Sequence, residues 1–184
     1  MFHRLHHVAY RCKDAQRTVD FYTKVIGLEY SAGMLPPEGN RHWHYKIHAE
    51  TIHIFFKLLD GSFLAFFEVA NFPEETPDTA TPIWIKHIAF EVPGMDYLIA
   101  AKKRLQDHGV DVRGPQDHYI CHSVYFEDPD GHRLEMASRS DVPGMWEKLA
   151  DKAPANLAEW NERKRRWAAE KSAVGEASKE HAPA

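Results

Sequence analysis

Along residues 3–138, segments in which every second residue is apolar are followed by segments in which apolar residues recur at helical spacing. This order of strand-like and helix-like segments occurs twice. A strand-like period of two in "LHHVAYRC" (5–12) precedes a helix-like spacing in "DAQRTVDFYTKVIG" (14–27). The same succession returns in "IKHIAFEV" (85–92) and "MDYLIAAKKRLQDHG" (95–109). The repeat predicts a duplicated unit in which a strand leads into a helix.

Both predicted helices carry signals at their ends. Asp14 can accept backbone hydrogen bonds as the N-cap of the first helix, and Gly27 can end that helix. Gly109 has the matching place after the second helix. The apolar residues expected to face the core are Val19, Phe21, Tyr22, Val25 and Ile26 in the first helix, and Leu98, Ala101 and Leu105 in the second.

Further strand-like segments follow each helix and complete two β-α-β-β-β modules, at about residues 3–70 and 83–138. These segments are 28–34, 42–49, 51–59 and 62–69 in the first module, and 110–115, 122–128 and 132–138 in the second. "LDGS" (59–62) and "DPDG" (128–131) are predicted hairpin turns, and the proline-rich stretch 71–82 is the predicted connection. The pattern therefore predicts an α+β fold over residues 1–140.

Residues 141–173 are predicted to form a helical extension outside the repeat. The basic run "ERKRRW" (162–167) lies between acidic residues and tryptophans at helical spacing, which is typical of a solvated helix face. Residues 174–184 are small, polar and charged, and are expected to be a flexible tail.

Composition and charge argue against several classes of protein but do not identify a function. The net charge of −4 over 184 residues gives no reason to expect a nucleic-acid partner. Every apolar run is shorter than the roughly 20 residues that span a membrane. The N-terminus lacks the apolar stretch of a signal peptide, and two cysteines are too few for a disulfide framework. A cytoplasmic location is expected.

Strand alternation indicates where two matching histidines point. In "HHVAYRC", Val8 and Tyr10 share the face expected to pack on the helices, so His7 faces the other way. In "KHIAFEV", the same argument places His87 opposite Ile88. Both histidines are followed at the second position by an alanine, which leaves room beside them. A core role for either histidine is therefore disfavoured.

Strand alternation also places Glu135 on the face opposite the core. It alternates with Leu134 and Met136 beyond the "DPDG" turn, so it should share the open face with His7 and His87. Two imidazoles and one carboxylate are the set typical of non-haem Fe(II) sites, which leave positions open for substrate and oxygen. The same ligands suit Zn, Ni, Co or Mn, so residue types alone leave the ion open.

With these motifs, the chain resembles the vicinal oxygen chelate superfamily, which includes glyoxalase I, epimerases, bleomycin-resistance proteins and type I extradiol dioxygenases. The resemblance covers about residues 3–138 and rests on "LHHVAYRCKDAQRTVDFYTKVIGL", "IKHIAFEV" and "EDPDGHRLEM". It implies a half-barrel sheet of paired modules with flanking helices. It also implies that His7, rather than His6, joins His87 and Glu135 as a metal ligand.

Within the superfamily, the region around Glu135 resembles the signature of small extradiol dioxygenases. His118, Val124, Tyr125, Asp128, Pro129, Gly131 and Glu135 match it, and only Gln116 stands where a smaller residue is usual. The discriminating residues are His118 and Tyr125, for which the resemblance implies catalytic roles. It implies an Fe(II) enzyme that opens a catechol-type ring with O₂, and a homodimer, the common state in the superfamily.

One strand of the first module leaves the choice between family members open. If "FLAF" follows the common family pattern, Ala65 occupies the slot of the fourth metal ligand found in glyoxalase I. If the strand is shifted by three residues, Glu68 does, and a glyoxalase-like or epimerase-like lyase or isomerase is the alternative. Extradiol enzymes carry an acid–base histidine near this strand, for which possible stand-ins are His44, His48 and His53.

The sequence leaves two further interpretations open. A metal-free binding protein of the bleomycin-resistance kind is a third hypothesis, disfavoured because such a protein does not need a complete ligand set. Several aromatic residues could line a pocket for an aromatic substrate, and ordinary sheet packing explains them equally well. These are Trp43, Tyr45, Phe55 and Phe66.

Overall fold

The computed structural model describes residues 4–35, 51–70, 81–82 and 85–180. The chain divides into two compact units, residues 1–140 and 141–184. The first unit contains both predicted modules, and the second contains the extension.

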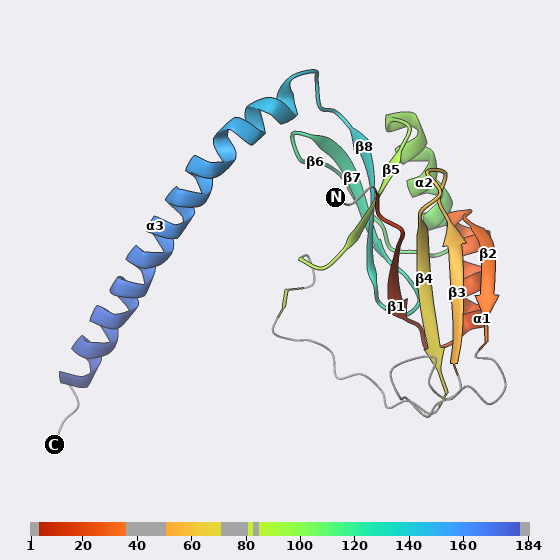
Figure 1. The fold of residues 1–184 in the computed structure, drawn as a ribbon, viewed down its shortest axis with the longest axis horizontal. Helices are drawn as coiled ribbons and strands as arrows, with labels where there is room; N and C mark the ends of the chain where they lie inside the picture. Colours follow the sequence, from red (N-terminus) through yellow and green to blue (C-terminus); the bar gives the residue numbers. More distant parts are fainter. Residues whose placement is uncertain (1–3, 36–50, 71–80, 83–84, 181–184) are drawn as a thin grey trace. The chain divides into compact units, whose positions relative to one another are not determined.

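The first module forms one four-stranded sheet with its helical segment packed on β4 and β2 (Figure 1). Its elements are β1 (His7–Arg11), α1 (Ala15–Asp20), η1 (Phe21–Ile26), β2 (Glu29–Met34), β3 (Thr51–Lys57) and β4 (Phe63–Val69). The strand order is β1-β4-β3-β2, in which β1 pairs with β4 in parallel and the other pairs are antiparallel.

The second module repeats this topology. Its elements are β5 (Ile88–Val92), α2 (Met95–Asp107), β6 (Arg113–Asp117), β7 (Cys121–Glu127) and β8 (Arg133–Arg139). The order β5-β8-β7-β6, with a parallel β5–β8 pair, matches the first sheet strand for strand. The α+β fold of paired β-α-β-β-β modules is therefore confirmed, with each module hydrogen-bonded as its own sheet.

The ends of the first helix follow the sequence signals. The Oδ1 atom of Asp14 accepts a hydrogen bond of 2.8 Å from the backbone N–H of Arg17, as expected of an N-cap. The helix then widens into the π-helical turn η1, where the N–H of Gly27 donates to the carbonyl oxygen of Tyr22 at 3.0 Å. Gly27 ends this turn with φ of 93°.

One strand begins later than predicted. The pattern indicated a strand over residues 110–115, whereas β6 starts at Arg113. The N–H of Val110 still donates to the carbonyl oxygen of Leu105 at 3.0 Å, next to Gly109 with φ of 77°. This bond belongs to the C-terminal cap of α2 and keeps the backbone out of the sheet for several residues. The predicted strand 42–49, and residues 71–80 of the predicted connection, lie outside the described residues.

One apolar core joins the helical segments of both modules to one face of each sheet. Tyr22, Leu98 and Leu105 are at most 1% exposed, as the helical spacing predicted. The sheets contribute alternate residues to the same cluster, including Ile54, Phe56, Leu64, Phe66, Val124, Phe126, Leu134 and Met136. The residues between them point to the opposite face of each sheet, which lies outside this core.

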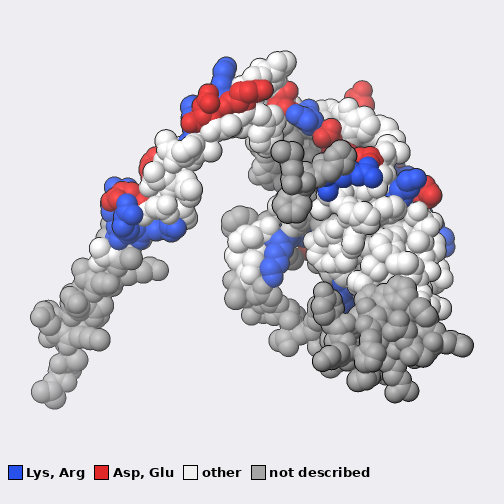
Figure 2. Space-filling model, viewed as in Figure 1, with Lys and Arg blue, Asp and Glu red and all other residues white. Residues whose placement is uncertain are grey.

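The second unit is dominated by one helix, α3 (Met145–Glu180). It continues past residue 173, where the pattern ended the extension, and includes part of the expected flexible tail. Ion pairs join Arg163 to Glu159 and Arg165 to Glu162. Figure 2 shows acidic and basic side chains together along its described part, as expected of a solvated helix face. Among the described residues, no helix has the length and apolar character needed to cross a membrane.

Candidate metal centre

The faces opposite the core carry the residues singled out in the sequence. In the first sheet, Val8 and Tyr10 pack against the core, while His7 is exposed and pairs in register with Phe63. In the second sheet, Ala89 of β5 pairs with Glu135 of β8. Strand alternation therefore predicted correctly that His7 and Glu135 leave the core face.

His87 and Glu135 converge at the start of the parallel β5–β8 pair. The Nε2 atom of His87 lies 3.0 Å from Oε2 of Glu135. The His87 side chain is 32% exposed, whereas that of Glu135 is 7% exposed, so the carboxylate lies under the imidazole at the sheet surface. The hydroxyl of the buried Ser123 donates to the other oxygen, Oε1 of Glu135. These contacts hold the carboxylate in a single orientation.

The spacing of this pair fits two ligands of one metal ion. Ligand atoms about 2.1 Å from an ion and about 90° apart around it lie roughly 3.0 Å from each other. The distance from His87 to Glu135 has this value. A hydrogen bond from outside the ligand set commonly orients a metal-binding carboxylate, and Ser123 supplies one here. The donor set therefore suits a divalent metal.

His7 lies on the first module, among aromatic rings. Its Nδ1 atom is 2.8 Å from Nδ1 of His6, and its ring centroid is 6.1 Å from that of His53 and 5.8 Å from that of Phe55. Within residues 4–35, 51–70, 81–82 and 85–180, no three His, Cys, Asp or Glu side chains lie close enough together to hold a metal. The structure therefore joins His87 to Glu135 and leaves His7 apart from them.

His118 and Tyr125, which the resemblance paired by motif, touch each other. The hydroxyl of Tyr125 is 2.7 Å from Nε2 of His118. Tyr125 also pairs in register with Glu135, and its ring meets the His87 ring edge to face at a centroid distance of 6.0 Å. Burial, and secondly the Glu135 carboxylate, raise the pKa of Tyr125 above its usual value of 10.0. Tyr125 is therefore a protonated hydroxyl at neutral pH.

The hairpin between β6 and β7 positions His118. The backbone N–H of His118 donates to the carbonyl oxygen of Cys121 at 2.8 Å, and Oδ1 of Asp117 accepts from the N–H of Tyr119 at 2.7 Å. Tyr119 adopts φ of 72°, so the chain turns sharply here. Gly114 has φ of 98°, and a side chain there would clash with the carbonyl oxygen of Ser123. A tight hairpin thus brings His118 to Tyr125.

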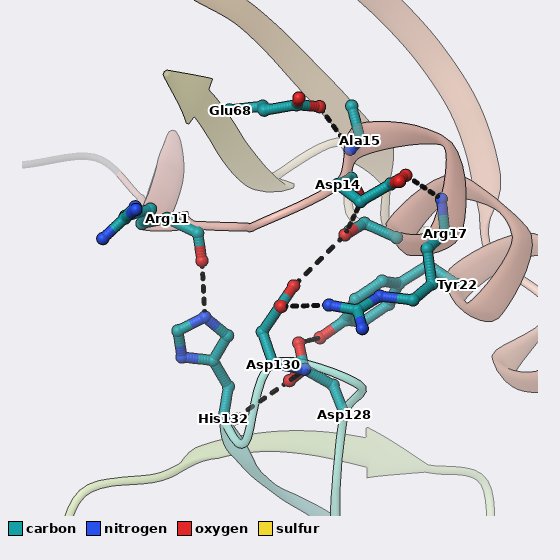
Figure 3. A network of polar contacts seen from close by, with 10 residues as sticks. Arg11, Asp14, Ala15, Arg17, Tyr22, Glu68, Asp128, Asp130 and His132 are labelled. Carbon is teal, nitrogen blue, oxygen red and sulfur yellow. Dashed lines mark hydrogen bonds and ion pairs between the residues drawn. The ribbon is translucent and has the colours of Figure 1, made fainter. Parts of the chain in front are cut away.

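Glu68 does not share the face of His7. Its Oε2 atom accepts a hydrogen bond of 2.6 Å from the backbone N–H of Ala15, at the start of α1 (Figure 3). Ala65 instead pairs with Ala9 of β1, on the His7 face. Of the two residues considered for the fourth-ligand slot, Ala65 is therefore the one on the His7 face, because β4 runs without a bulge between these positions.

Three further residues of this region are placed by the structure and are not singled out by the local sequence patterns: Ser123, Arg133 and His53. Ser123 precedes Tyr125 by two positions, so its place beside Glu135 could have been inferred from strand parity. Arg133 lies over the Tyr125 ring, with Cζ 4.5 Å from the ring centroid, a contact that no local pattern indicates. His53, one of the three possible stand-ins for the acid–base histidine, is buried at 7% exposure.

The aromatic residues considered for a substrate pocket separate in the structure. Phe55 lies on the His7 face, where its centroid is 4.0 Å from that of His53. Phe66 is 1% exposed and belongs to the core, packed against Tyr22. Trp43 and Tyr45 lie outside the described residues.

Comparisons with known proteins agree with this fold of two repeated modules. A family model described as the Glyoxalase/Bleomycin resistance protein/Dioxygenase superfamily matches residues 4–62 and 63–136. The chain is 38% identical over 64 residues to biphenyl-2,3-diol 1,2-dioxygenase 3 of Rhodococcus globerulus, a match that covers 35% of the chain and 32% of that enzyme. The chain thus spans only about a third of that relative's length.

Two other proteins are similar over most of their own length. The metallothiol transferase FosB of Bacillus licheniformis is 32% identical over 139 residues, which cover 74% of the chain and 75% of FosB. The crystal structure of a glyoxalase family protein from Enterococcus faecalis has a TM-score of 0.54 at 27% identity, over 74% of the chain and 98% of that protein. Together with the duplicated modules, these matches show that the chain belongs to the glyoxalase/bleomycin resistance/dioxygenase superfamily, the vicinal oxygen chelate superfamily.

Proposed function

We propose that the protein is an Fe(II)-dependent extradiol dioxygenase that opens a catechol-type ring with O₂, and that His7, His87 and Glu135 hold the metal. The observation that carries the proposal is the contact of Tyr125 with His118 directly beside the His87–Glu135 pair. A metal-binding pair next to a phenol–imidazole pair suits a reaction in which a bound diol loses and regains protons. We also propose a cytoplasmic homodimer.

The chain's own groups have separate tasks in this proposal. Fe(II), when bound, supplies one-electron chemistry between the diol and O₂. Ser123 orients Glu135 toward the metal through its hydrogen bond to Oε1. In the relay we propose, the Tyr125 oxygen accepts a proton from a diol hydroxyl while its own hydrogen passes to Nε2 of His118 through the 2.7 Å contact, and the reverse transfer returns the proton.

His53 is the residue we propose as the acid–base histidine missing from β4. It lies on β3, and its register partner on β4 is Phe67, against which its ring stacks at 3.6 Å. Its centroid is 6.1 Å from that of His7. The other two candidates, His44 and His48, lie outside the described residues. A buried histidine on the His7 face can move a proton away from bulk water.

The experiment that tests the function is anaerobic loading with Fe(II), followed by addition of O₂ to a panel of catechols that includes 2,3-dihydroxybiphenyl. Ring opening should give a yellow product that absorbs in the visible range, and metal-free protein should give none. Failure across the panel, together with turnover of a hemithioacetal after Ni or Zn loading, would transfer the assignment to the glyoxalase-like alternative. The place of Glu68 on the helix face speaks against that outcome.

The two adjacent histidines should respond differently to substitution. His7→Ala should remove a metal ligand, so iron content and ring-opening activity should both fall to background. His6→Ala should leave activity measurable and weaken iron binding by roughly 10- to 100-fold, because His6 contacts Nδ1 of His7 and can orient it. Iron titration under anaerobic conditions measures both. An equal loss from both variants would mean that the assignment of His7 as the ligand is wrong.

A further inference from the structure

A cavity of about 450 Å³ opens beside Tyr125, lined by residues of the second module and by Phe21 of η1 in the first. Its size falls within the range of small-molecule sites in proteins, roughly 300–1,000 Å³. Apolar and aromatic side chains form much of its wall, namely Phe21, Val110, Tyr125, Phe126 and Pro129. Two arginines, Arg113 and Arg133, also line it. The cavity shares only Tyr125 with the residues assigned above to the reaction.

Arg133 contributes a buried hydrogen-bond donor to the wall of this cavity. Its Nε atom is shielded from solvent and has no hydrogen-bond acceptor within the part of the chain that the structure describes. The guanidinium stacks on the Tyr125 ring, with Cζ 4.5 Å from the centroid. A buried donor without an acceptor costs free energy, so such a group in a cavity wall indicates a ligand that supplies the acceptor.

The neighbouring charges leave this arginine available. The Asp128 carboxylate already accepts from Tyr22 and from the backbone N–H groups of Asp130 and His132. Asp111 lies 3.9 Å from Nε of Arg113 and is highly exposed. Glu127 is exposed and pairs in strand register with Arg133, but these two side chains form no ion pair. Arg113 adds a second positive charge at the exposed side of the cavity.

The spacing along β8 relates this arginine to the metal-binding pair. Arg133 precedes Glu135 by two positions, so both side chains leave the same face of the sheet. Two strand residues span about 7 Å, comparable to the length of one substituted benzene ring. A single ring chelated beside Glu135 can therefore present its far substituent to Arg133. The planar guanidinium is suited to bind a carboxylate through two parallel hydrogen bonds.

We propose that Arg133 binds a carboxylate on the substrate, so that the enzyme selects catechols with a carboxylate-bearing substituent opposite the diol. This inference rests on the proposed ring-opening function and adds the substrate class to it. Arg113 assists from the cavity mouth. The ring of the substrate lies along Tyr125, and its two hydroxyls face His87 and Glu135.

The test compares 3,4-dihydroxyphenylacetate with 4-methylcatechol, which differ in the carboxylate. In the iron-loaded enzyme, kcat/KM should favour the carboxylate substrate. Arg133→Gln should lower that preference by roughly 10- to 100-fold, mainly through KM, because charged hydrogen bonds are lost. Arg133→Lys, which retains the charge without the planar fork, should be intermediate. The matched control is Arg139→Gln on the same strand and face, outside the cavity wall, and it should keep the wild-type preference.

A binding measurement separates this inference from the proposed function. Calorimetry with 4-hydroxyphenylacetate and 4-methylphenol requires no turnover, and only the carboxylate should bind more weakly to Arg133→Gln than to the wild type. If no catechol is opened but this difference persists, the dioxygenase assignment fails and the carboxylate site stands. If catechols are opened and Arg133→Gln affects both substrates equally, Arg133 only supports Tyr125 and the carboxylate site is refuted. Circular dichroism spectra check that each variant folds.

Discussion

Glu135→Gln should abolish iron binding and ring opening while the protein keeps its fold. Glutamine has nearly the same shape and can still accept the hydrogen bond of Ser123, but it removes the negative charge that a divalent ion needs beside His87. The loss of activity should exceed the roughly 10- to 100-fold effect typical of residues that only orient a ligand. Because glutamine fills the same buried space, the free energy of unfolding of the metal-free protein should change by less than about 1 kcal/mol.

Iron content, measured after anaerobic loading and desalting, is the primary readout for this variant. Glu91→Gln is the matched control, since Glu91 points from β5 to the same face, is 68% exposed, and is ion-paired with Arg139 at 4.0 Å. This control should bind iron and open catechols as the wild type does. Wild-type iron content in Glu135→Gln would show that the His87–Glu135 pair is a structural contact rather than a metal site.

Asp128→Ala should cause the largest loss of stability among single substitutions outside the apolar core. The Asp128 side chain accepts hydrogen bonds of 2.9 Å from the buried Tyr22 hydroxyl and from the backbone N–H groups of Asp130 and His132 (Figure 3). Alanine leaves these donors without an acceptor, and the Tyr22 hydroxyl lies too deep for bulk water. Each unsatisfied buried donor costs about 1–3 kcal/mol, so the expected loss is roughly 2–4 kcal/mol.

The same turn also joins the two modules, which adds to its effect. Asp130 forms an ion pair with Arg17 of α1, and the carbonyl oxygen of Arg11 accepts from Nε2 of His132 at 2.7 Å (Figure 3). A displaced turn therefore weakens the contact between modules as well as the hairpin. Burial and the nearby Asp128 carboxylate raise the pKa of Tyr22 well above its usual value, so this hydroxyl is protonated and can donate at neutral pH.

Thermal unfolding followed by near-ultraviolet circular dichroism measures this effect. A loss of 2–4 kcal/mol corresponds to a fall in Tm of roughly 4–16 °C for a chain of this size. The control is Asp60→Ala in the equivalent turn of the first module, where the exposed Asp60 carboxylate accepts from the N–H and hydroxyl of Ser62, its neighbour two positions along the chain. That variant should lose less than about 1 kcal/mol. Equal losses from the two variants would mean that the buried contact with Tyr22 contributes nothing.

The element pattern could be predicted because its signals are local. The caps at Asp14 and Gly27, the two hairpin turns and the alternation in β1, β5 and β8 all appear in the structure where the residues place them. The late start of β6 could not be predicted, since it depends on whether the backbone after Gly109 continues the cap of α2 or enters the sheet. Local propensity is similar for both choices, and the hydrogen bond to Leu105 decides between them.

The candidate site could be predicted only in part, because its side-chain contacts depend on strand pairing and not on local sequence. The alternation of side chains along each strand predicted the faces of His7 and Glu135. It does not indicate which side chains on one face contact each other. The register of the parallel β5–β8 pair brings Glu135 under His87, and the β7–β8 register adds Ser123 and Tyr125. His7 belongs to a separate sheet, so no strand register links it to the other two.

The sequence by itself determined the duplicated modules, the helix ends and the face on which each strand residue lies, because these follow from local backbone geometry and short-range hydrogen bonds. Only the tertiary structure decided that Glu68 turns to the start of α1, that Ser123 holds Glu135, and that Arg133 stacks on Tyr125. Those contacts depend on pairing register and on side chains from distant segments. A single sequence records neither, because both are set by the packing of the whole domain.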